Sequence, residues 1–154
     1  MESKIFVPSI DFETFINREV DTVFNALTSS YTWDNWFTTG MVLEPVEGGV
    51  IHFKWENWGP HKYFGEDTGK ILKLEKNKVF EFQWHGNSNI PDTIVTMTLS
   101  KMDEGTHLHL IETGYLDNPI GRGWMLSCAS GWGEALTLLK MYLEHGITYT
   151  RRNL

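Results

Sequence analysis

The chain has 154 residues, of which 14% are aromatic, and its formal net charge is −7 at pH 7. This length is enough for one domain with a substantial core and too short for two typical domains. The negative charge argues against binding to nucleic acid or to anionic membranes, because the largest Lys/Arg cluster is the pair Arg151–Arg152.

The sequence has no segment that would take the chain into or across a membrane. Residues 1–6 lack the apolar run of a signal peptide, and no stretch approaches the length of a transmembrane helix. Cys128 is the only cysteine, so we expect neither an internal disulfide nor a cysteine-based zinc site. We therefore expect one soluble cytoplasmic domain over residues 1–154, with its core at about 9–146.

The N-terminal region predicts one strand and then two short helices. Residues 9–16 alternate between apolar and polar side chains, which is the pattern of a half-buried strand. Residues 20–27 follow helical spacing, with Asn17 as a candidate N-cap. Ser29 and Ser30 can cap the second short helix.

The middle of the chain predicts a series of strands with short connections. Gly48–Gly49 has the composition of a tight turn, and residues 57–60 and 85–91 have that of loops. The alternation in residues 63–75 is imperfect, so we expect a bulge near Gly69. The predicted strands cover residues 41–46, 50–55, 63–75, 79–84, 93–99 and 106–113.

The last quarter of the chain predicts one long amphipathic helix over residues 118–146. Pro119 stands near its start, and Gly146 can supply the left-handed residue that ends it. Its apolar residues recur with the three-four spacing of a helix that buries one face. They are Met125, Cys128, Ala129, Trp132, Leu136, Leu139 and Leu143.

Together these elements predict an α+β fold. Short connections between consecutive strands favour an antiparallel meander, whose apolar face needs a cover. The C-terminal helix is the only predicted element that is long enough to supply it. We therefore expect a curved antiparallel sheet of about seven strands that wraps around this helix, with two short helices after the first strand.

Several motifs follow one another in the order found in a known family. Arg18–Thr28 matches the first helix of that family, and Gly48–Phe53 resembles its Gly-Gly hairpin. The other matching positions are Trp33, Trp36, Gly69–Leu74, Val79–Trp84, Gly105–Leu110, Gly131–Trp132, Leu136, Leu139 and Leu143–Glu144. The sequence thus resembles the family related to the activator of the 90-kDa heat-shock chaperone ATPase, in the START-like (SRPBCC) helix-grip superfamily.

The resemblance implies a helix-grip fold and two kinds of function. Relatives enclose an apolar pocket between sheet and helix, where many bind lipids, sterols, polyketides or hormones. The eukaryotic namesake uses such a domain to bind and stimulate the chaperone. We therefore expect binding of a small hydrophobic or amphipathic ligand without a cofactor, with regulation of the heat-shock chaperone ATPase as the alternative.

The candidates for a ligand cavity are the side chains that the sheet and the helix direct towards each other. A strongly curved sheet diverges from a straight helix, and ligand pockets typically hold about 300–1,000 Å³. The same side chains can instead fill a dry core, because protein interiors are tightly packed. The candidates are Trp36 at the mouth, Phe53, Trp55, Phe80, Phe82, Trp84, Met97, Leu108, Leu110, Glu112, Met125, Ala129, Trp132 and Leu136.

Two further features favour a cavity, and each has an alternative. Glu112 shares the face of Leu108 and Leu110, where burial would raise its pKa; alternatively, the alternation breaks and Glu112 reaches solvent. Four glycines in or beside the long helix weaken it, which indicates close backbone approach or free space. They are Gly121, Gly123, Gly131 and Gly133. Alternatively, the first two belong to the preceding loop, and Gly131 lets a strand approach.

The sequence gives little support for a metal site. His107 and His109 can point the same way from one strand, and His52 or His85 could add a third ligand. No local spacing sets that third ligand. The pair also lies opposite the apolar face of its strand, so we expect two solvated histidines and no metal.

Catalysis is the third hypothesis. A cyclase- or hydrolase-type enzyme could use Glu112 with Tyr63 or His61 for acid–base chemistry. Asp67 and Asp92 have the sequence surroundings of surface charges in turns. We find no Gly-rich phosphate loop, no serine nucleophile elbow and no Cys–His pairing above chance, so an enzyme is the least favoured of the three functions.

Overall fold

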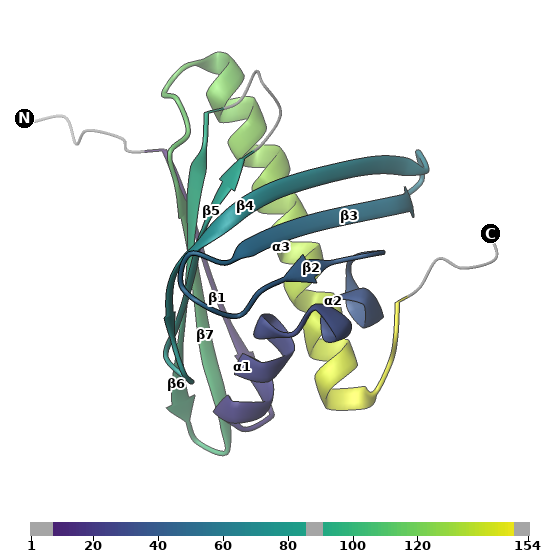
Figure 1. Ribbon diagram of the computed structural model, residues 1–154, viewed down its shortest axis with the longest axis vertical. Coiled ribbons are helices and arrows are strands. Elements are labelled where there is room, and N and C mark those ends of the chain that lie inside the picture. The colour runs from purple at the N-terminus through teal and green to yellow at the C-terminus, as the bar shows by residue number, and fades with distance from the viewer. Residues whose placement is uncertain (1–7, 86–90, 150–154) are drawn as a thin grey trace, which may run out of the picture.

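The computed structural model describes residues 8–85 and 91–149, which form seven strands and three helices (Figure 1). In chain order these are β1 (Ser9–Ile16), α1 (Val20–Thr28), α2 (Ser30–Trp36), β2 (Val42–Leu43), β3 (Val50–Trp58), β4 (Tyr63–Glu75), β5 (Val79–His85), β6 (Thr93–Met102), β7 (Gly105–Thr113) and α3 (Pro119–His145). Most of the loop predicted over residues 85–91 lies outside the described residues.

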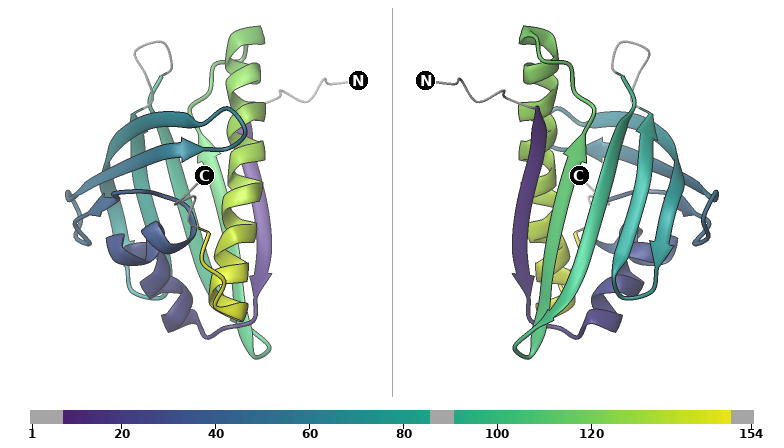
Figure 2. Two further views of the ribbon diagram at one scale, coloured as in Figure 1. Left: turned by 90° about the vertical axis from the view of Figure 1, so that its right-hand side faces the viewer. Right: turned by 90° about the vertical axis from the view of Figure 1, so that its left-hand side faces the viewer.

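The strands form one antiparallel sheet in the order β1-β7-β6-β5-β4-β3-β2. Strands β2 to β7 follow one another as a meander, and β1 closes the sheet by pairing with β7. The sheet is strongly curved, and α3 lies along its concave side (Figure 2). The predicted helix-grip α+β fold is therefore confirmed.

Strand β3 is longer than its sequence pattern predicts. Its register with β4 shifts between Trp55 and Trp58, and Asn57 between them has a left-handed φ of 57°. A bulge of this kind absorbs an extra residue without ending the strand. Asn57 and Trp58 consequently belong to β3, and the predicted loop over residues 57–60 is wrong in its first half.

Strand β4 carries an irregularity near Gly69, as the sequence predicts. The register with β5 shifts between Ile71 and Lys73. Gly69 serves close approach instead, because a Cβ atom there would overlap the carbonyl oxygen of Gln83 on β5. The glycine was therefore a sound signal for an unusual backbone, but it marks strand contact and not the bulge.

Two predictions in the first third of the chain need correction. Helix α1 begins after Glu19 without a side-chain cap, so Asn17 is not its N-cap. Instead, the backbone N–H of Asn17 donates to the side chain of Glu144 (2.8 Å). The strand predicted over residues 41–46 is reduced to Val42–Leu43.

Both ends of α3 are capped, and the sequence predicts the cap at the C-terminal end. The side chain of Asn118 accepts a hydrogen bond from the backbone N–H of Gly121 (2.8 Å), and Gly146 ends the helix with a φ of 67°. The guanidinium of Arg18 donates to the carbonyl of Glu144 (2.7 Å). The C-terminal end of α3 is thus held against the segment that precedes α1.

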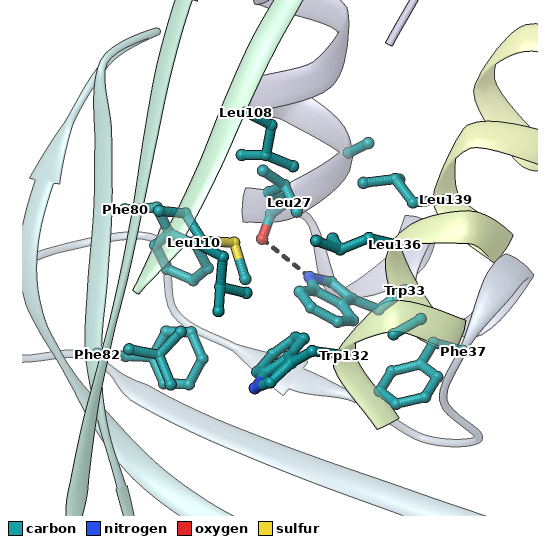
Figure 3. Close-up of a cluster of buried hydrophobic side chains, with 14 of the residues drawn as sticks. Leu27, Trp33, Phe37, Phe80, Phe82, Leu108, Leu110, Trp132, Leu136 and Leu139 are labelled. Atoms are coloured by element: carbon teal, nitrogen blue, oxygen red, sulfur yellow. Dashed lines mark hydrogen bonds between the residues drawn. The ribbon is translucent and has the colours of Figure 1, made fainter. Parts of the chain in front are cut away.

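The packed core occupies the end of the sheet next to α1 and α2 (Figure 3). Trp33 is fully buried, and its indole N–H donates to the carbonyl of Leu27 (2.8 Å). Other large or apolar side chains of this core are Phe53, Phe80, Phe82, Met97, Leu108, Leu110, Ala135, Leu136 and Leu139. The C-terminal half of α3 therefore packs tightly against the sheet.

The N-terminal half of α3 is packed less closely. Its first turns extend beyond the ends of the strands (Figure 2), and Ile120 and Leu126 are 72% and 66% exposed. Met125 and Trp132 are buried, so only one face of this half meets the sheet. The sheet and α3 diverge here, and the space between them is the candidate site.

Candidate ligand-binding cavity

A hollow of about 370 Å³ lies between the N-terminal half of α3 and the sheet. The last residues of β3, β5 and β7 and the first residues of β4 and β6 reach it. The described residues that line it are Phe37, Trp55, Trp58, Tyr63, Asp67, Trp84, Pro91, Thr93, Glu112, Tyr115, Trp124, Ser127, Cys128, Gly131, Trp132 and Glu134. Half of these residues are aromatic.

Glu112 belongs to the buried side of this wall. It pairs with Val95 on β6 and keeps the inward alternation of Leu108 and Leu110 along β7. Only 1% of Glu112 is exposed. The alternative that Glu112 reaches solvent is therefore excluded.

Three neighbours donate hydrogen bonds to the Glu112 carboxyl. The hydroxyl of Thr93 donates to Oε1 (2.9 Å), while the hydroxyl of Tyr115 (2.9 Å) and the indole N–H of Trp132 (3.2 Å) donate to Oε2. Thr93 is within reach because it lies two residues before Val95, the cross-strand partner of Glu112. The carboxyl thus connects β6, β7 and α3 at one point.

Tyr115 reaches Glu112 because the chain turns back immediately after β7. Gly114 has a φ of 115°, and a Cβ atom there would press on the backbone of Asp92. The hydroxyl of Tyr115 also interacts with the thiol of Cys128 on α3. Gly114 therefore places Tyr115 between the sheet and the helix.

Burial controls the titration of this cluster. It raises the pKa of the Glu112 carboxyl, although the hydrogen bonds from Tyr115, Thr93 and Trp132 act in the opposite direction. Burial also raises the pKa of Tyr115 and of Cys128. The tyrosine hydroxyl and the thiol therefore stay protonated at neutral pH.

A second carboxyl, that of Asp67, lies on the opposite part of the wall. Asp67 is in the middle of a long strand, β4, and pairs with Phe53 on β3. The interpretation of Asp67 as a surface charge in a turn is therefore wrong. Burial raises the pKa of Asp67, while a hydrogen bond with Trp84 and the charge of His52 partly oppose the rise.

Aromatic rings surround the two carboxyls. Trp84 stacks on Phe53 (centroids 4.9 Å apart) and meets Trp132 edge to face (5.4 Å). Phe37 and Trp58 make a further edge contact (5.3 Å) on the side of α2. These contacts hold the rings in fixed orientations, so the wall is rigid as well as apolar.

Gly131 contributes free space to the cavity. A Cβ atom at Gly131, Gly133 or Gly123 would meet no atom within 4 Å, whereas one at Gly121 would overlap the carbonyl oxygen of Leu116. All four glycines belong to α3, so the alternative that the first two lie in a loop is wrong. Gly131 also does not serve the approach of a strand, since only Gly121 has close backbone contact.

A family model described as Activator of Hsp90 ATPase homolog 1-like protein matches residues 17–144. The chain belongs to this family. The resemblance drawn from the order of its sequence motifs is confirmed, and the matched residues run from the end of β1 to the last turn of α3. No curated protein matches the sequence of this family member.

Several solved structures share the fold of this chain at low sequence identity. CalU16 from Micromonospora echinospora is 23% identical, with a TM-score of 0.72 over 90% of this chain and 77% of its own. The Aha1 dimer from Colwellia psychrerythraea is 23% identical, with a TM-score of 0.73 over 90% of this chain and 97% of its own. DynU16, in the dynemicin biosynthetic locus, is 19% identical, with a TM-score of 0.77 over 92% of this chain and 50% of its own. These likenesses establish the fold alone.

The fold of this family member separates the predicted cavity residues into two groups. Trp55, Trp84, Glu112 and Trp132 line the hollow. Trp36, Phe53, Phe80, Phe82, Met97, Leu108, Leu110, Met125 and Leu136 belong to the buried core, and Ala129 packs partly buried against it. Trp36, expected at the mouth, is fully buried, and its neighbour Phe37 lines the hollow instead.

Sequence reasoning did not include several residues that shape the cavity. Asp67 and Tyr63 were left out of the inward set because the alternation of β4 is interrupted by glycines. Tyr115 follows a strand end, where periodicity gives no information. The glycine at position 114 was the one available signal, because a glycine between a strand and an aromatic residue indicates a sharp turn.

The histidine pair lies outside the cavity. His107 pairs with Glu13 (2.8 Å) and His109 with Asp11 (2.6 Å), across strands β7 and β1 on the outer side of the sheet. In the described part of the chain, no three His, Cys, Asp or Glu residues gather as metal ligands. None of the described helices combines the length and apolar character needed to cross a membrane.

Proposed function

We propose that the protein binds a small apolar or amphipathic molecule in the cavity between the sheet and α3. The observation that carries this proposal is the hollow of about 370 Å³ directly beside a core that is filled. Protein interiors normally reach crystal-like packing density, so space of this size with an aromatic wall is unusual without a ligand role.

The size and wall of the cavity limit the ligand. Its volume lies near the lower end of the range of ligand pockets, about 300–1,000 Å³. The rings of Trp84 and Trp132, which meet edge to face in the wall, favour a flat or ring-containing body. We therefore expect a compact molecule of a few rings, smaller than a sterol or a two-chain lipid.

One structural relative supports a small-molecule role. DynU16, which has the same fold, is a protein in the dynemicin biosynthetic locus. Association with a biosynthetic locus is consistent with a scaffold that handles a small organic compound. The identity of 19% carries this support no further than the fold.

The experiment uses Gly131 to fill the cavity from the helix. Gly131→Phe places a ring where a Cβ atom meets nothing within 4 Å and where the residue lines the hollow. Gly133→Phe is the matched control, because Gly133 has equal local space on the same helix but is not among the described lining residues. The neutral fluorophore N-phenyl-1-naphthylamine reports uptake, and circular dichroism reports folding.

We expect the wild-type protein and Gly133→Phe to bind the fluorophore, and Gly131→Phe to bind it at least about tenfold more weakly, which corresponds to 1.4 kcal/mol. Equal binding by all three proteins, or absence of binding by the wild type, contradicts the proposal. Native mass spectrometry of the freshly purified wild type provides a second measurement, since a retained molecule adds a discrete mass.

The two alternative functions stay predictions. Regulation of a heat-shock chaperone is tested by adding the protein to the 90-kDa chaperone and measuring its ATPase rate. Acid–base catalysis would use the Glu112 carboxyl, and Glu112→Gln tests it once a substrate is known. Tyr63 is the first residue of β4, and His61 lies two residues before it. Both are exposed, and of the two only Tyr63 lines the cavity.

A further inference from the structure

The charged side chains among the described lining residues of the cavity are all acidic. They are Asp67, Glu112 and Glu134, and this described wall contains no Lys, Arg or His. An anionic ligand, such as a fatty acid or a phosphate ester, would therefore be repelled at close range.

Glu112 and Asp67 differ in how many hydrogen-bond and ion-pair partners their carboxyl groups have. Glu112 accepts three hydrogen bonds, from Thr93, Tyr115 and Trp132, and is almost fully buried. Asp67 interacts with the side chain of Trp84, and it makes no ion pair with any residue of the described chain. A carboxylate accepts about four hydrogen bonds, so Asp67 has capacity left on the cavity side.

The wall supplies what a cation needs besides a carboxylate. Trp55, Trp58 and Trp84 and the ring of Tyr63 line the same side of the cavity as Asp67. The faces of such rings attract organic cations, which is how aromatic cages hold ammonium groups. A metal ion fits less well, because no three acidic, His or Cys residues of the described chain gather around one point.

Trp55 adds an independent sign of an absent partner. Trp55 is 6% exposed and belongs to the cavity wall, yet its indole N–H has no hydrogen-bond partner among the described residues. A buried N–H without a partner is unfavourable, and most buried donors in proteins find one. An acceptor atom on a ligand in the cavity would satisfy it. A protonated amine cannot supply that acceptor, so Trp55 supports an occupant of the cavity and not the charge of that occupant.

We propose that the cavity takes a ligand with a flat, ring-containing body and a protonated amine, and that Asp67 is the residue that pairs with this amine. This inference rests on the proposed function and adds the chemical class of the ligand. Glu112 acts differently, since it positions Trp132 and Tyr115 in the wall. The selectivity of the cavity is therefore for cations over neutral molecules and for neutral molecules over anions.

The test compares three probes of nearly equal shape with the full-length chain at pH 7. They are 1-naphthylmethylamine, which is protonated, 1-naphthalenemethanol, which is neutral, and 1-naphthoate, which is anionic. Isothermal titration calorimetry measures their affinities. We expect the amine to bind at least about tenfold more tightly than the alcohol, and the carboxylate to bind most weakly.

Two variants on β4 locate the effect. Asp67→Asn keeps the size of the side chain and its capacity to accept from Trp84, and should bring the affinity of the amine down to that of the alcohol. The alcohol should bind within about twofold of its wild-type affinity. Glu66→Gln removes the same charge from the adjacent residue, which is exposed and pairs with His52, and should leave all three affinities unchanged within the same factor.

The possible failures are distinguishable. The amine inference is overturned if the alcohol binds as tightly as the amine and Asp67→Asn changes the affinity of neither the alcohol nor the amine. The proposed function stands in that case, and also if N-phenyl-1-naphthylamine binds as tightly as the amine. If Glu66→Gln weakens the amine as much as Asp67→Asn does, net charge explains the preference and Asp67 makes no specific contact. If no probe binds, the proposed function fails as well. The wild-type ranking of the three probes tests the inference even if a variant does not fold.

Discussion

The indole N–H of Trp132 and the carboxyl of Glu112 form a hydrogen bond of 3.2 Å that joins α3 to β7 at the wall of the cavity. An indole nitrogen can only donate, so the Glu112 oxygen that receives it must act as an acceptor. Tyr115 donates to the same oxygen. The carboxyl therefore fixes the position of two aromatic side chains that bound the hollow.

Substitution of Glu112 should reveal this role in stability. Glu112→Leu leaves the groups of Thr93, Tyr115 and Trp132 without their buried acceptor, and we expect it to lower the free energy of unfolding by roughly 3 kcal/mol. Glu112→Gln keeps one carbonyl acceptor and should cost about 1 kcal/mol. Urea unfolding at pH 7 measures both, and equal stability of the two variants would contradict this account.

The pH dependence of stability should carry the signature of Asp67. Burial raises the pKa of Asp67 above its ordinary value of 3.8, so the folded protein keeps this proton at pH values at which the unfolded chain has lost it. Stability is therefore lost as the pH rises through that window. Asp67→Asn removes the loss, and above the window the variant should be more stable by roughly a few tenths of a kcal/mol, because water screens a partly exposed carboxyl.

Urea unfolding of Asp67→Asn and of the wild type between pH 3 and pH 8 checks this prediction, with Glu66→Gln as the control for loss of one charge from β4. The advantage of Asp67→Asn should shrink as the pH is lowered. An advantage that grows towards acid pH would have the opposite sign and would refute the buried position assigned to Asp67.

Two glycines of α3 should respond to alanine in opposite directions. Gly131→Ala meets free space and should raise the free energy of unfolding by up to about 1 kcal/mol through helix propensity. Gly121→Ala forces its Cβ atom into the carbonyl oxygen of Leu116 and should lower it by roughly 2 kcal/mol. Thermal unfolding followed by circular dichroism distinguishes the two; a gain at both positions would mean that the turn before α3 adjusts freely.

The N-cap of α3 provides a further test. Asn118 accepts from the N–H of Gly121, so Asn118→Ala should lower the free energy of unfolding by about 1 kcal/mol, while Asn118→Asp keeps the acceptor and should change it little. The same thermal assay applies. Equal losses in the two variants would show that the side chain contributes through something other than its oxygen.

The periodicity of the sequence was sufficient for the fold because each element has a clear pattern. The inward positions of Leu108 and Leu110 on β7 and the apolar stripe of α3 were predicted correctly, and of the two alternatives left open for Glu112 the inward one holds. The cap at Gly146 follows from local chemistry alone. Where a boundary depended on tertiary context, as at Asn57 in β3, the prediction was wrong because a bulge leaves no reliable pattern.

The extent of the cavity could not be predicted for a related reason. Phe82 and Trp84 lie two residues apart on the same face of β5, yet Phe82 is fully buried in the core while Trp84 lines the hollow. Alternation gives the face of a strand but not the point along it where the sheet leaves the helix. The contacts of Glu112 with Thr93 and Tyr115 likewise depend on strand register and on the turn at Gly114.

The attachment of α3 at its C-terminal end separates two demands on one molecule. Leu136 and Leu139 secure the fold at that end, whereas a Cβ atom at Gly131 meets free space and Asp67 makes no ion pair with a described residue. Under the proposed ligand-binding function, replacements at Gly131 and Asp67 would alter which compound is accepted without unfolding the chain. A few amino-acid changes at these positions would then diversify the specificity.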